Sequence, residues 1–149
     1  MEFDSSINLK SVATHSVASD KDIETFVHNL WDTGAQTAKN IAQAGETEIW
    51  LDYSDTLRTK YLSVYVEAEE GGYRLSYKAG SKPSRIGDAV MILCLLLAFW
   101  LGSKVLVPQP PVVNIVGAIL SLAAAGAVVV YSGKAFGKAE AEELTKKVK

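Results

Sequence analysis

Two long apolar runs dominate the second half of the chain, and the Pro-rich segment Pro108-Gln109-Pro110-Pro111 separates them. The first run covers about residues 86–107; the second covers about 112–132 and contains no charged residue. A helix rises about 1.5 Å per residue, so each run can cross a hydrocarbon core about 30 Å thick. The stretch 89–101 lacks the polar face of an amphipathic core helix. The pattern therefore predicts a transmembrane helical hairpin over residues 86–132.

A different periodicity marks the first half of the chain. Apolar residues recur at spacings of three and four over about residues 20–44, namely Ile23, Phe26, Val27, Leu30, Trp31, Ala38, Ile41 and Ala42. Ser19 and Asp22 stand at capping-box spacing, and Gly45 is a typical helix stop. This pattern predicts one amphipathic helix. Before it, Ile7, Leu9 and Val12 indicate a short strand, and the segment 11–19 is interpreted as an irregular lead-in.

Strand-like alternation follows the predicted helix. Residues 46–53 and 61–68 alternate between apolar and polar, and Gly71-Gly72 precedes a third alternating segment, 73–78. A two-residue type I′ turn requires positive φ at both central positions, which favours two glycines. We therefore expect residues 1–85 to form a small α+β domain with one helix on a three-stranded antiparallel meander. The hairpin follows it, and residues 133–149 are expected to form a short charged C-terminal helix.

The charges are distributed unevenly between the two halves. Residues 1–85 carry nine Lys and Arg against thirteen Asp and Glu, a net charge of −4, whereas residues 86–149 have a net charge of +2. An acidic domain argues against a nucleic-acid partner. Basic residues flank both apolar runs, whereas the connection between the runs has only Lys104. By the positive-inside rule, both termini are expected in the cytoplasm, with a plasma (inner) membrane favoured over an endoplasmic-reticulum membrane.

A stripe of small residues marks the second apolar run. Gly117, Ser121 and Ala125 are spaced by four residues, and Gly133 and Gly137 follow in the same phase. Small side chains let helix backbones approach closely in lipid, so these five residues are a candidate helix-packing interface. The contact can lie within the hairpin or between copies of the chain, and the sequence favours neither.

No pattern in the sequence predicts chemistry. His15 and His28 are isolated, and Asp88 is interpreted as a helix-terminal residue beside Arg85. The single cysteine, Cys94, lies inside the first apolar run and excludes an intramolecular disulfide. We expect a protein that is not an enzyme, without catalytic residues, cofactor or metal site.

The predicted architecture leaves two functional hypotheses. The first is a membrane-anchored interaction or accessory subunit that scaffolds or regulates a larger membrane protein assembly. The second is a small oligomeric pore-forming or membrane-perturbing protein of the holin or defence-effector kind. Expected partners are other membrane protein subunits or copies of the chain itself, together with the lipid bilayer.

Overall fold

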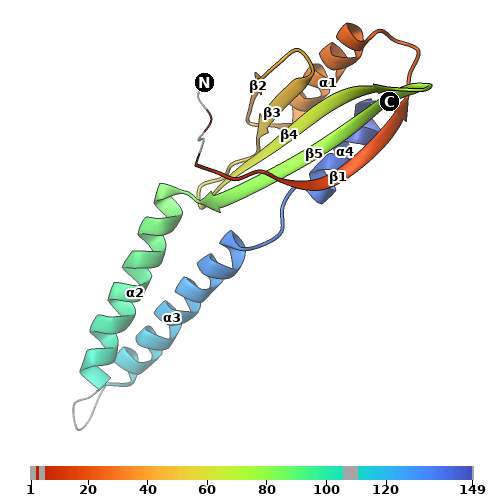
Figure 1. The fold of residues 1–149 in the computed structure, drawn as a ribbon. Coiled ribbons are helices and arrows are strands. Elements are labelled where there is room, and N and C mark those ends of the chain that lie inside the picture. Colours follow the sequence, from red (N-terminus) through yellow and green to blue (C-terminus); the bar gives the residue numbers. More distant parts are fainter. Residues whose placement is uncertain (1–2, 4–5, 106–110, 149) are drawn as a thin grey trace. The chain divides into compact units, whose positions relative to one another are not determined.

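A five-stranded antiparallel sheet and four helices make up the computed structural model, which describes residue 3 and residues 6–105 and 111–148. The elements in chain order are β1 (Lys10–Ala18), α1 (Ile23–Thr37), β2 (Asn40–Gln43), β3 (Glu48–Asp52), β4 (Arg58–Glu69), β5 (Gly72–Pro83), α2 (Arg85–Val105), α3 (Val112–Ser132) and α4 (Lys138–Val148) (Figure 1). They form two units. The α+β unit comprises Met1–Asp55, Thr59–Lys82 and Ala135–Lys149, and the hairpin unit comprises Thr56–Arg58 and Pro83–Lys134.

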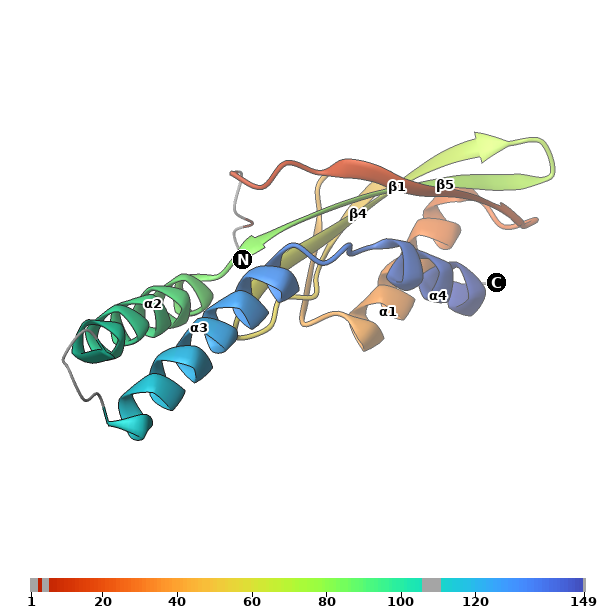
Figure 2. The ribbon, with the colours of Figure 1, turned by 90° about the horizontal axis from the view of Figure 1, so that it is seen from below.

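The sheet of the α+β unit has the strand order β1-β5-β4-β3-β2. Thus β1 and β2 are the edge strands, and α1 connects one edge to the other. Helices α1 and α4 cover the same face of the sheet (Figure 2). The register places apolar residues of neighbouring strands opposite one another, as with Val17 and Tyr73, Leu51 and Leu62, and Ile41 and Leu51.

Apolar residues at every second position of β5 and of residues 62–66 in β4 build much of the core. Leu62, Val64 and Val66 of β4 are buried on the helix-covered face, and so are Leu75 and Tyr77 of β5. Side chains two residues apart in a strand point to the same face, so one face of each strand becomes apolar. The two helices complete this core with Phe26, Val27 and Leu30 from α1 and with Ala141, Leu144 and Val148 from α4.

The predicted three-stranded layout is wrong, because β1 and β2 extend the sheet at both edges. Residues 10–18 are β1 rather than an irregular lead-in, and they pair with β5 from Lys10 to Ala18. The predicted helix is also too long: it ends at Thr37, and residues 40–43 pair with β3 as β2. The Ala38, Ile41 and Ala42 spacing fits a helix, but backbone pairing with β3 decides the conformation. At the other end, the helix begins after Asp22 rather than after Ser19.

The β4–β5 turn also differs from the predicted type I′ turn. Only Gly71 has positive φ, at +80°, and β5 already begins at Gly72. A positive φ at a single glycine is the conformation that a type II turn requires at its third position. Gly72 is needed for another reason: a Cβ there would lie 2.0 Å from the carbonyl oxygen of Val17 in β1. The turn thus starts β5 one residue earlier than predicted, directly against β1.

The C-terminal segment has a packing role that its charge does not indicate. In α4, Ala141, Leu144, Thr145 and Val148 are buried, while Glu142 pairs with Lys146 at 3.3 Å on the exposed side. Gly137 precedes the helix with φ +111°, and a Cβ there would lie 2.4 Å from the Cβ of Ala79. The chain therefore returns to the sheet after the hairpin and adds a helix to the core.

Candidate functional site

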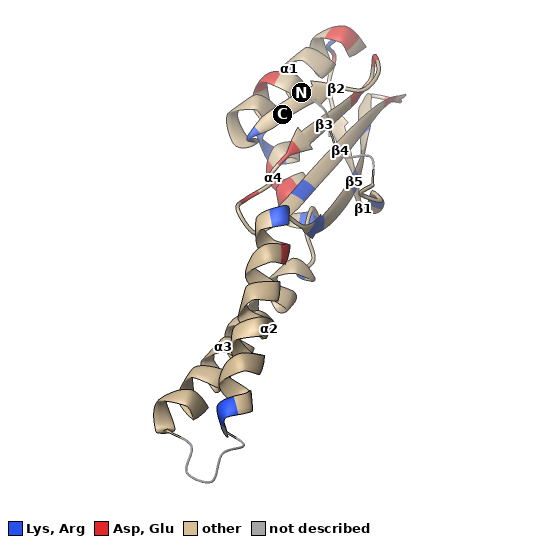
Figure 3. Cartoon of the chain, turned by 90° about the vertical axis from the view of Figure 1, so that its left-hand side faces the viewer, with Lys and Arg blue, Asp and Glu red and all other residues tan. Residues whose placement is uncertain are grey.

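The surface of the hairpin unit is almost entirely apolar. Among the described residues, α2 carries charge only at Arg85, Asp88 and Lys104, and α3 carries none (Figure 3). Large exposed side chains run along both helices: Ile86, Ile92, Leu93, Leu95, Leu96, Leu97, Phe99, Trp100, Val112, Val113, Val116, Ile119, Leu120, Leu122, Val129 and Val130. Soluble monomers rarely expose apolar patches larger than a few hundred Å². This surface therefore requires a cover of lipid or protein.

Length and hydropathy make both helices suitable for spanning a membrane. The spans are Arg85–Lys104 and Val112–Ser132, with mean hydropathies of 2.1 and 2.3. Only 11% of each most apolar window is buried within the chain. A core helix of a soluble protein would be mostly buried, so these helices are apolar on sides that face no other part of the chain. At about 1.5 Å per residue, each span matches a hydrocarbon core of about 30 Å.

Small side chains mediate the contact between α2 and α3. A Cβ on Gly117 would lie 2.8 Å from Cδ1 of Leu101, so the glycine lets the Leu101 side chain pack closely on α3. Ser121 and Ala125, on the same stripe, are buried, as is Ala98 of α2. The Ser121 hydroxyl donates a hydrogen bond of 2.8 Å to the Gly117 carbonyl oxygen, so its polar group is satisfied within its own helix. The structure thus places these three candidate residues against α2 of the same chain.

The other two candidate glycines lie outside this contact. Helix α3 ends at Ser132, and Gly133 is its exposed C-terminal cap. Gly137 lies in the α+β unit, packed on Val12 and Ala79. A spacing of four residues places side chains on one face only while the helix continues. Gly133 and Gly137 therefore do not extend the stripe.

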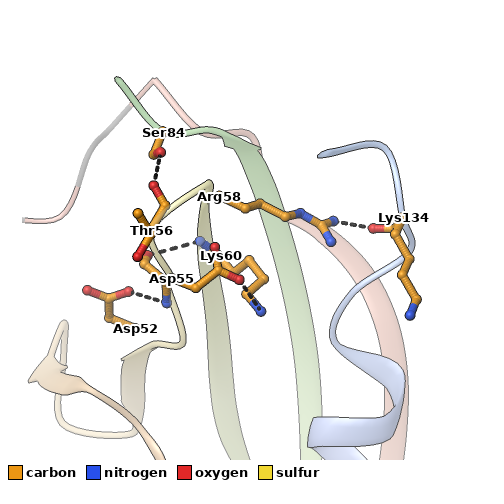
Figure 4. A network of polar contacts seen from close by, with 8 residues as sticks. Asp52, Asp55, Thr56, Arg58, Lys60, Ser84 and Lys134 are labelled. Atoms are coloured by element: carbon orange, nitrogen blue, oxygen red, sulfur yellow. Dashed lines mark hydrogen bonds and ion pairs between the residues drawn. The ribbon is translucent and has the colours of Figure 1, made fainter. Parts of the chain in front are cut away.

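The base of the hairpin is held by the short segment 56–58. The Ser84 backbone N–H donates to the Leu57 carbonyl oxygen at 3.1 Å, and the Ser84 hydroxyl donates to the Thr56 carbonyl oxygen at 2.6 Å (Figure 4). The same hydroxyl accepts the Gly87 N–H at 2.9 Å, which is an N-cap hydrogen bond for α2. A Cβ on Gly87 would lie 2.2 Å from the Leu57 carbonyl oxygen. Segment 56–58 therefore lies directly against the first turn of α2.

Arg58 connects the same segment to the end of α3. Its guanidinium donates to the Lys134 carbonyl oxygen (Figure 4) and lies over the Tyr131 ring, 5.7 Å from the centroid. Carbonyl groups at a helix C-terminus carry partial negative charge, which favours a cation there. One three-residue segment thus contacts both the start of α2 and the end of α3. The sequence carries no signal for Arg58, although Ser84, directly before the apolar run, is a typical N-cap residue.

A polar turn precedes that segment within the α+β unit. Asp52 Oδ1 accepts the Ser54 N–H at 2.8 Å, the Ser54 hydroxyl accepts the Lys60 N–H at 3.0 Å, and Lys60 pairs with Asp55 at 3.6 Å (Figure 4). Lys60 Nζ also lies 5.5 Å from the centre of the Phe136 ring. These bonds fix the conformation of the β3–β4 connection on both sides of residues 56–58.

Two tyrosines, the buried Tyr77 and the half-buried Tyr53, join the strands to the helices that cover the sheet. The Tyr77 and Thr145 hydroxyls are 2.7 Å apart, and burial raises the pKa of Tyr77 to about 12. The Tyr53 and Thr37 hydroxyls are 3.0 Å apart. Burial raises the pKa of Tyr53 as well, and the carboxylates of Glu140 and Glu143 raise it further. Both phenols are therefore held neutral, as structural hydrogen-bonding groups between the sheet and helices α1 and α4.

Groups with potential chemistry lie apart from one another. His15 packs edge-on against the Tyr77 ring at 5.8 Å, whereas His28 lies 3.5 Å from Asp32 on an exposed face of α1. Asp88 and Cys94 are on α2. Across the described part of the chain, no group of three or more His, Cys, Asp or Glu side chains is placed to hold a metal ion.

Comparisons of the chain with protein-family models, with curated proteins and with solved structures found no match. Its function is therefore inferred from the hairpin and the α+β unit themselves.

Proposed function

We propose that the protein is a membrane-anchored interaction subunit, whose hairpin spans the bilayer and whose α+β unit scaffolds or regulates a larger membrane protein assembly. One observation carries this proposal: the hairpin is inserted within the α+β unit. Strand β5 precedes the two apolar helices, α4 follows them, and both contribute to one hydrophobic core. The hairpin that anchors the protein is thus an insertion within the α+β unit.

This insertion constrains how the chain crosses the membrane. A folded core cannot be divided by a bilayer, so β5 and α4 must lie on the same side. Two crossings bring the chain back to that side, whereas one crossing would separate Tyr77 from Thr145, which are hydrogen-bonded at 2.7 Å. Helices α2 and α3 supply the two crossings.

The flanking charges favour the cytoplasm for the α+β unit. Lysine and arginine residues concentrate on the flanks that join this unit: Lys78, Lys82, Arg85, Lys134, Lys138, Lys146, Lys147 and Lys149. The connection between the spans carries no Lys or Arg, and Lys104, at the last turn of α2, is the only basic residue near it. Cytoplasmic flanks are enriched in these residues, so we assign the α+β unit and both termini to the cytoplasmic side of a plasma (inner) membrane.

Site-directed labelling tests this orientation. With Cys94 replaced by Ala, a cysteine introduced at Gly45 reports on the α+β unit, because a Cβ there has no neighbour within 4 Å. A second cysteine at Gln109, which lies outside the described residues, reports on the connection between the spans. A membrane-impermeant maleimide applied to intact cells should label position 109 and should label position 45 only after permeabilisation. Labelling of position 45 in intact cells would reverse the orientation.

An interaction role fits the hairpin better than a pore. A water-filled path needs polar side chains, whereas the small residues of α3 pack on α2 and the outward side chains are apolar. Purification in a mild detergent, followed by mass measurement and identification of co-purifying proteins, tests the proposal. Other membrane proteins in stoichiometric amount support the accessory role. A large ring of this chain alone would overturn it in favour of the pore-forming alternative.

A further inference from the structure

The α+β unit contains an open groove between α1 and the turn that joins β2 to β3. Two adjoining cavities of about 430 and 370 Å³ form it. They share Glu24 of α1 and both Gln43 and Glu46 at the β2–β3 turn, so they are two parts of one groove. Its length follows α1 from Ile23 to Asp32.

The walls of this groove are held in place by the fold. On one side, Val27 is buried in the core, which fixes the rotation of α1. On the other side, the N–H groups of Ala44 and Gly45 donate to the Glu48 carbonyl oxygen at 3.0 and 3.4 Å. A preformed groove binds a ligand at a lower entropic cost than a surface that must first become ordered.

The lining of the groove combines negative charge with apolar surface. Glu24, Asp32 and Glu46 are exposed along it, His28 lies 3.5 Å from Asp32, and the described residues that line it include no Lys or Arg. Ile23 is 38% exposed, and the partly exposed Trp31 adds a large aromatic surface. A matching ligand therefore has several positive charges and at least one large apolar side chain.

We propose that this groove binds a basic, Lys/Arg-rich juxtamembrane segment of a partner membrane protein. The proposal rests on the function inferred above and names the chemistry of the partner. Cytoplasmic flanks of membrane proteins are rich in Lys and Arg, so charge complementarity matches them to this acidic groove. Anchoring both proteins in one membrane raises the effective concentration of such a segment, so a weak individual contact suffices.

The chain's own basic segments do not fit the groove as well. Lys146 and Lys147 pair with Glu142 and Glu143 at 3.3 and 2.9 Å on α4, and this helix is packed into the core. Lys82 donates to Ser6 at 2.8 Å at the end of β5. These lysines lie on a helix and a strand of the folded unit, so the backbone around them is not free to extend along the groove. A different protein is therefore favoured over a second copy.

The test measures binding of a defined peptide to the full chain in nanodiscs of zwitterionic lipid, which do not attract the peptide themselves. The probe is a short fluorescein-labelled peptide of Lys and Arg residues around one central Phe, followed by fluorescence anisotropy. The test variant is Glu24→Gln with Glu46→Gln. The matched control is Glu67→Gln with Glu70→Gln, which removes the same charge from exposed positions outside the groove.

We expect saturable binding that weakens about tenfold in the groove variant, since the ion pairs of two exposed carboxylates with the peptide are lost. The control variant should bind like the wild type, and replacing the central Phe of the peptide by Ser should also weaken binding. Absence of binding to the wild type, or equal losses in the two variants, would overturn the proposal, because equal losses would indicate attraction by net charge alone.

Co-purification from cells separates this proposal from the accessory function. A membrane partner that is retained by wild type and control but lost from the groove variant supports both. A partner retained equally by all three overturns the groove and leaves the accessory function intact. Peptide binding that passes the test above, without any co-purifying membrane protein, supports the groove and overturns the accessory function.

Discussion

Replacement of Leu144 by Ala tests whether the segment after the hairpin belongs to the core of the α+β unit. Leu144 is 2% exposed and belongs to the same buried cluster as Leu75 and Tyr77 of β5. Alanine has the highest helix propensity, so the substitution does not weaken α4 as a helix. Its effect on stability therefore reports the loss of packing.

Deleting the buried part of a leucine side chain costs about 2–5 kcal/mol, from lost transfer free energy and the cavity left behind. This is a large part of the free energy of unfolding of a small domain, which is about 5–15 kcal/mol. Amide hydrogen exchange of the full chain in detergent gives a direct measurement. Because about 1.4 kcal/mol corresponds to a factor of ten, protection at Leu75 and Tyr77 should fall about 30-fold to several thousand-fold.

Glu142→Ala provides the control on the same helix. Glu142 and Lys146 are exposed, and such an exposed pair contributes only about 0.2–1 kcal/mol. Protection in β5 should therefore stay close to that of the wild type. If Leu144→Ala also left protection in β5 unchanged, α4 would not be part of the core, and the argument that two crossings return the chain to one folded unit would be refuted.

The remaining predictions concern the turn, a buried phenol and the hairpin contact. Gly71→Ala should lower the free energy of unfolding by about 1–2 kcal/mol, because an L-residue disfavours φ +80°. Gly72→Ala should lower it further, because the added Cβ would lie 2.0 Å from a carbonyl oxygen of β1. Urea unfolding ranks the two variants, and a Gly72→Ala variant as stable as the wild type would contradict the register of β1 on β5. Tyr77→Phe should cost about 0.5–1.5 kcal/mol through its lost hydrogen bond to α4. Because burial raises the pKa of Tyr77 from 10.0 to about 12, the wild type should lose stability as the pH rises through this window and the variant should lose less, as measured by unfolding below pH 10.0 and within the window. Ser121→Leu should leave membrane insertion intact on alkaline extraction but increase deuterium uptake across α3, whereas Ser121→Ala should not; unchanged uptake in the leucine variant would place this residue away from α2.

The hairpin could be predicted closely because its signal is local. The apolar pattern predicts helices over about residues 86–107 and 112–132, and the structure has them over Arg85–Val105 and Val112–Ser132, with residues 106 and 107 outside its described part. Continuous hydrophobicity of this length has few structural alternatives. Helical spacing predicts the stripe of Gly117, Ser121 and Ala125, but α3 ends at Ser132, so the stripe does not extend to Gly133 and Gly137.

The alternating strands were predictable for the same reason, whereas the sheet edges were not. Apolar residues at every second position of β4 and β5 predict buried strands, and Leu62, Val64, Leu75 and Tyr77 are indeed buried. In β1, however, only Val17 is fully buried, and the other side chains are mostly short or polar. Such an edge strand is specified by hydrogen bonds to its neighbour, which no local pattern reveals.

Tertiary contacts decide the remaining differences. Residues 40–43 have a spacing compatible with a helix, but pairing of Ile41 with Leu51 makes them a strand. Helix α4 is rich in charge and buries one stripe, Ala141, Leu144, Thr145 and Val148. The surface that this stripe covers depends on contacts with strands that precede the hairpin in the sequence, such as the Tyr77–Thr145 hydrogen bond. The groove between α1 and the β2–β3 turn depends on the same distant arrangement, so it could not be expected from the order of residues alone.

The insertion of the hairpin between β5 and α4 also has a consequence for biosynthesis. Chains leave the ribosome from the N-terminus at about 5–20 residues per second, so both apolar helices are synthesised before α4. The part of the sheet that Ala141 and Leu144 cover therefore remains exposed until both apolar helices have been synthesised. Release of α4 from the ribosome then completes the core, so in the proposed membrane protein the spans would reach the bilayer before the domain closes.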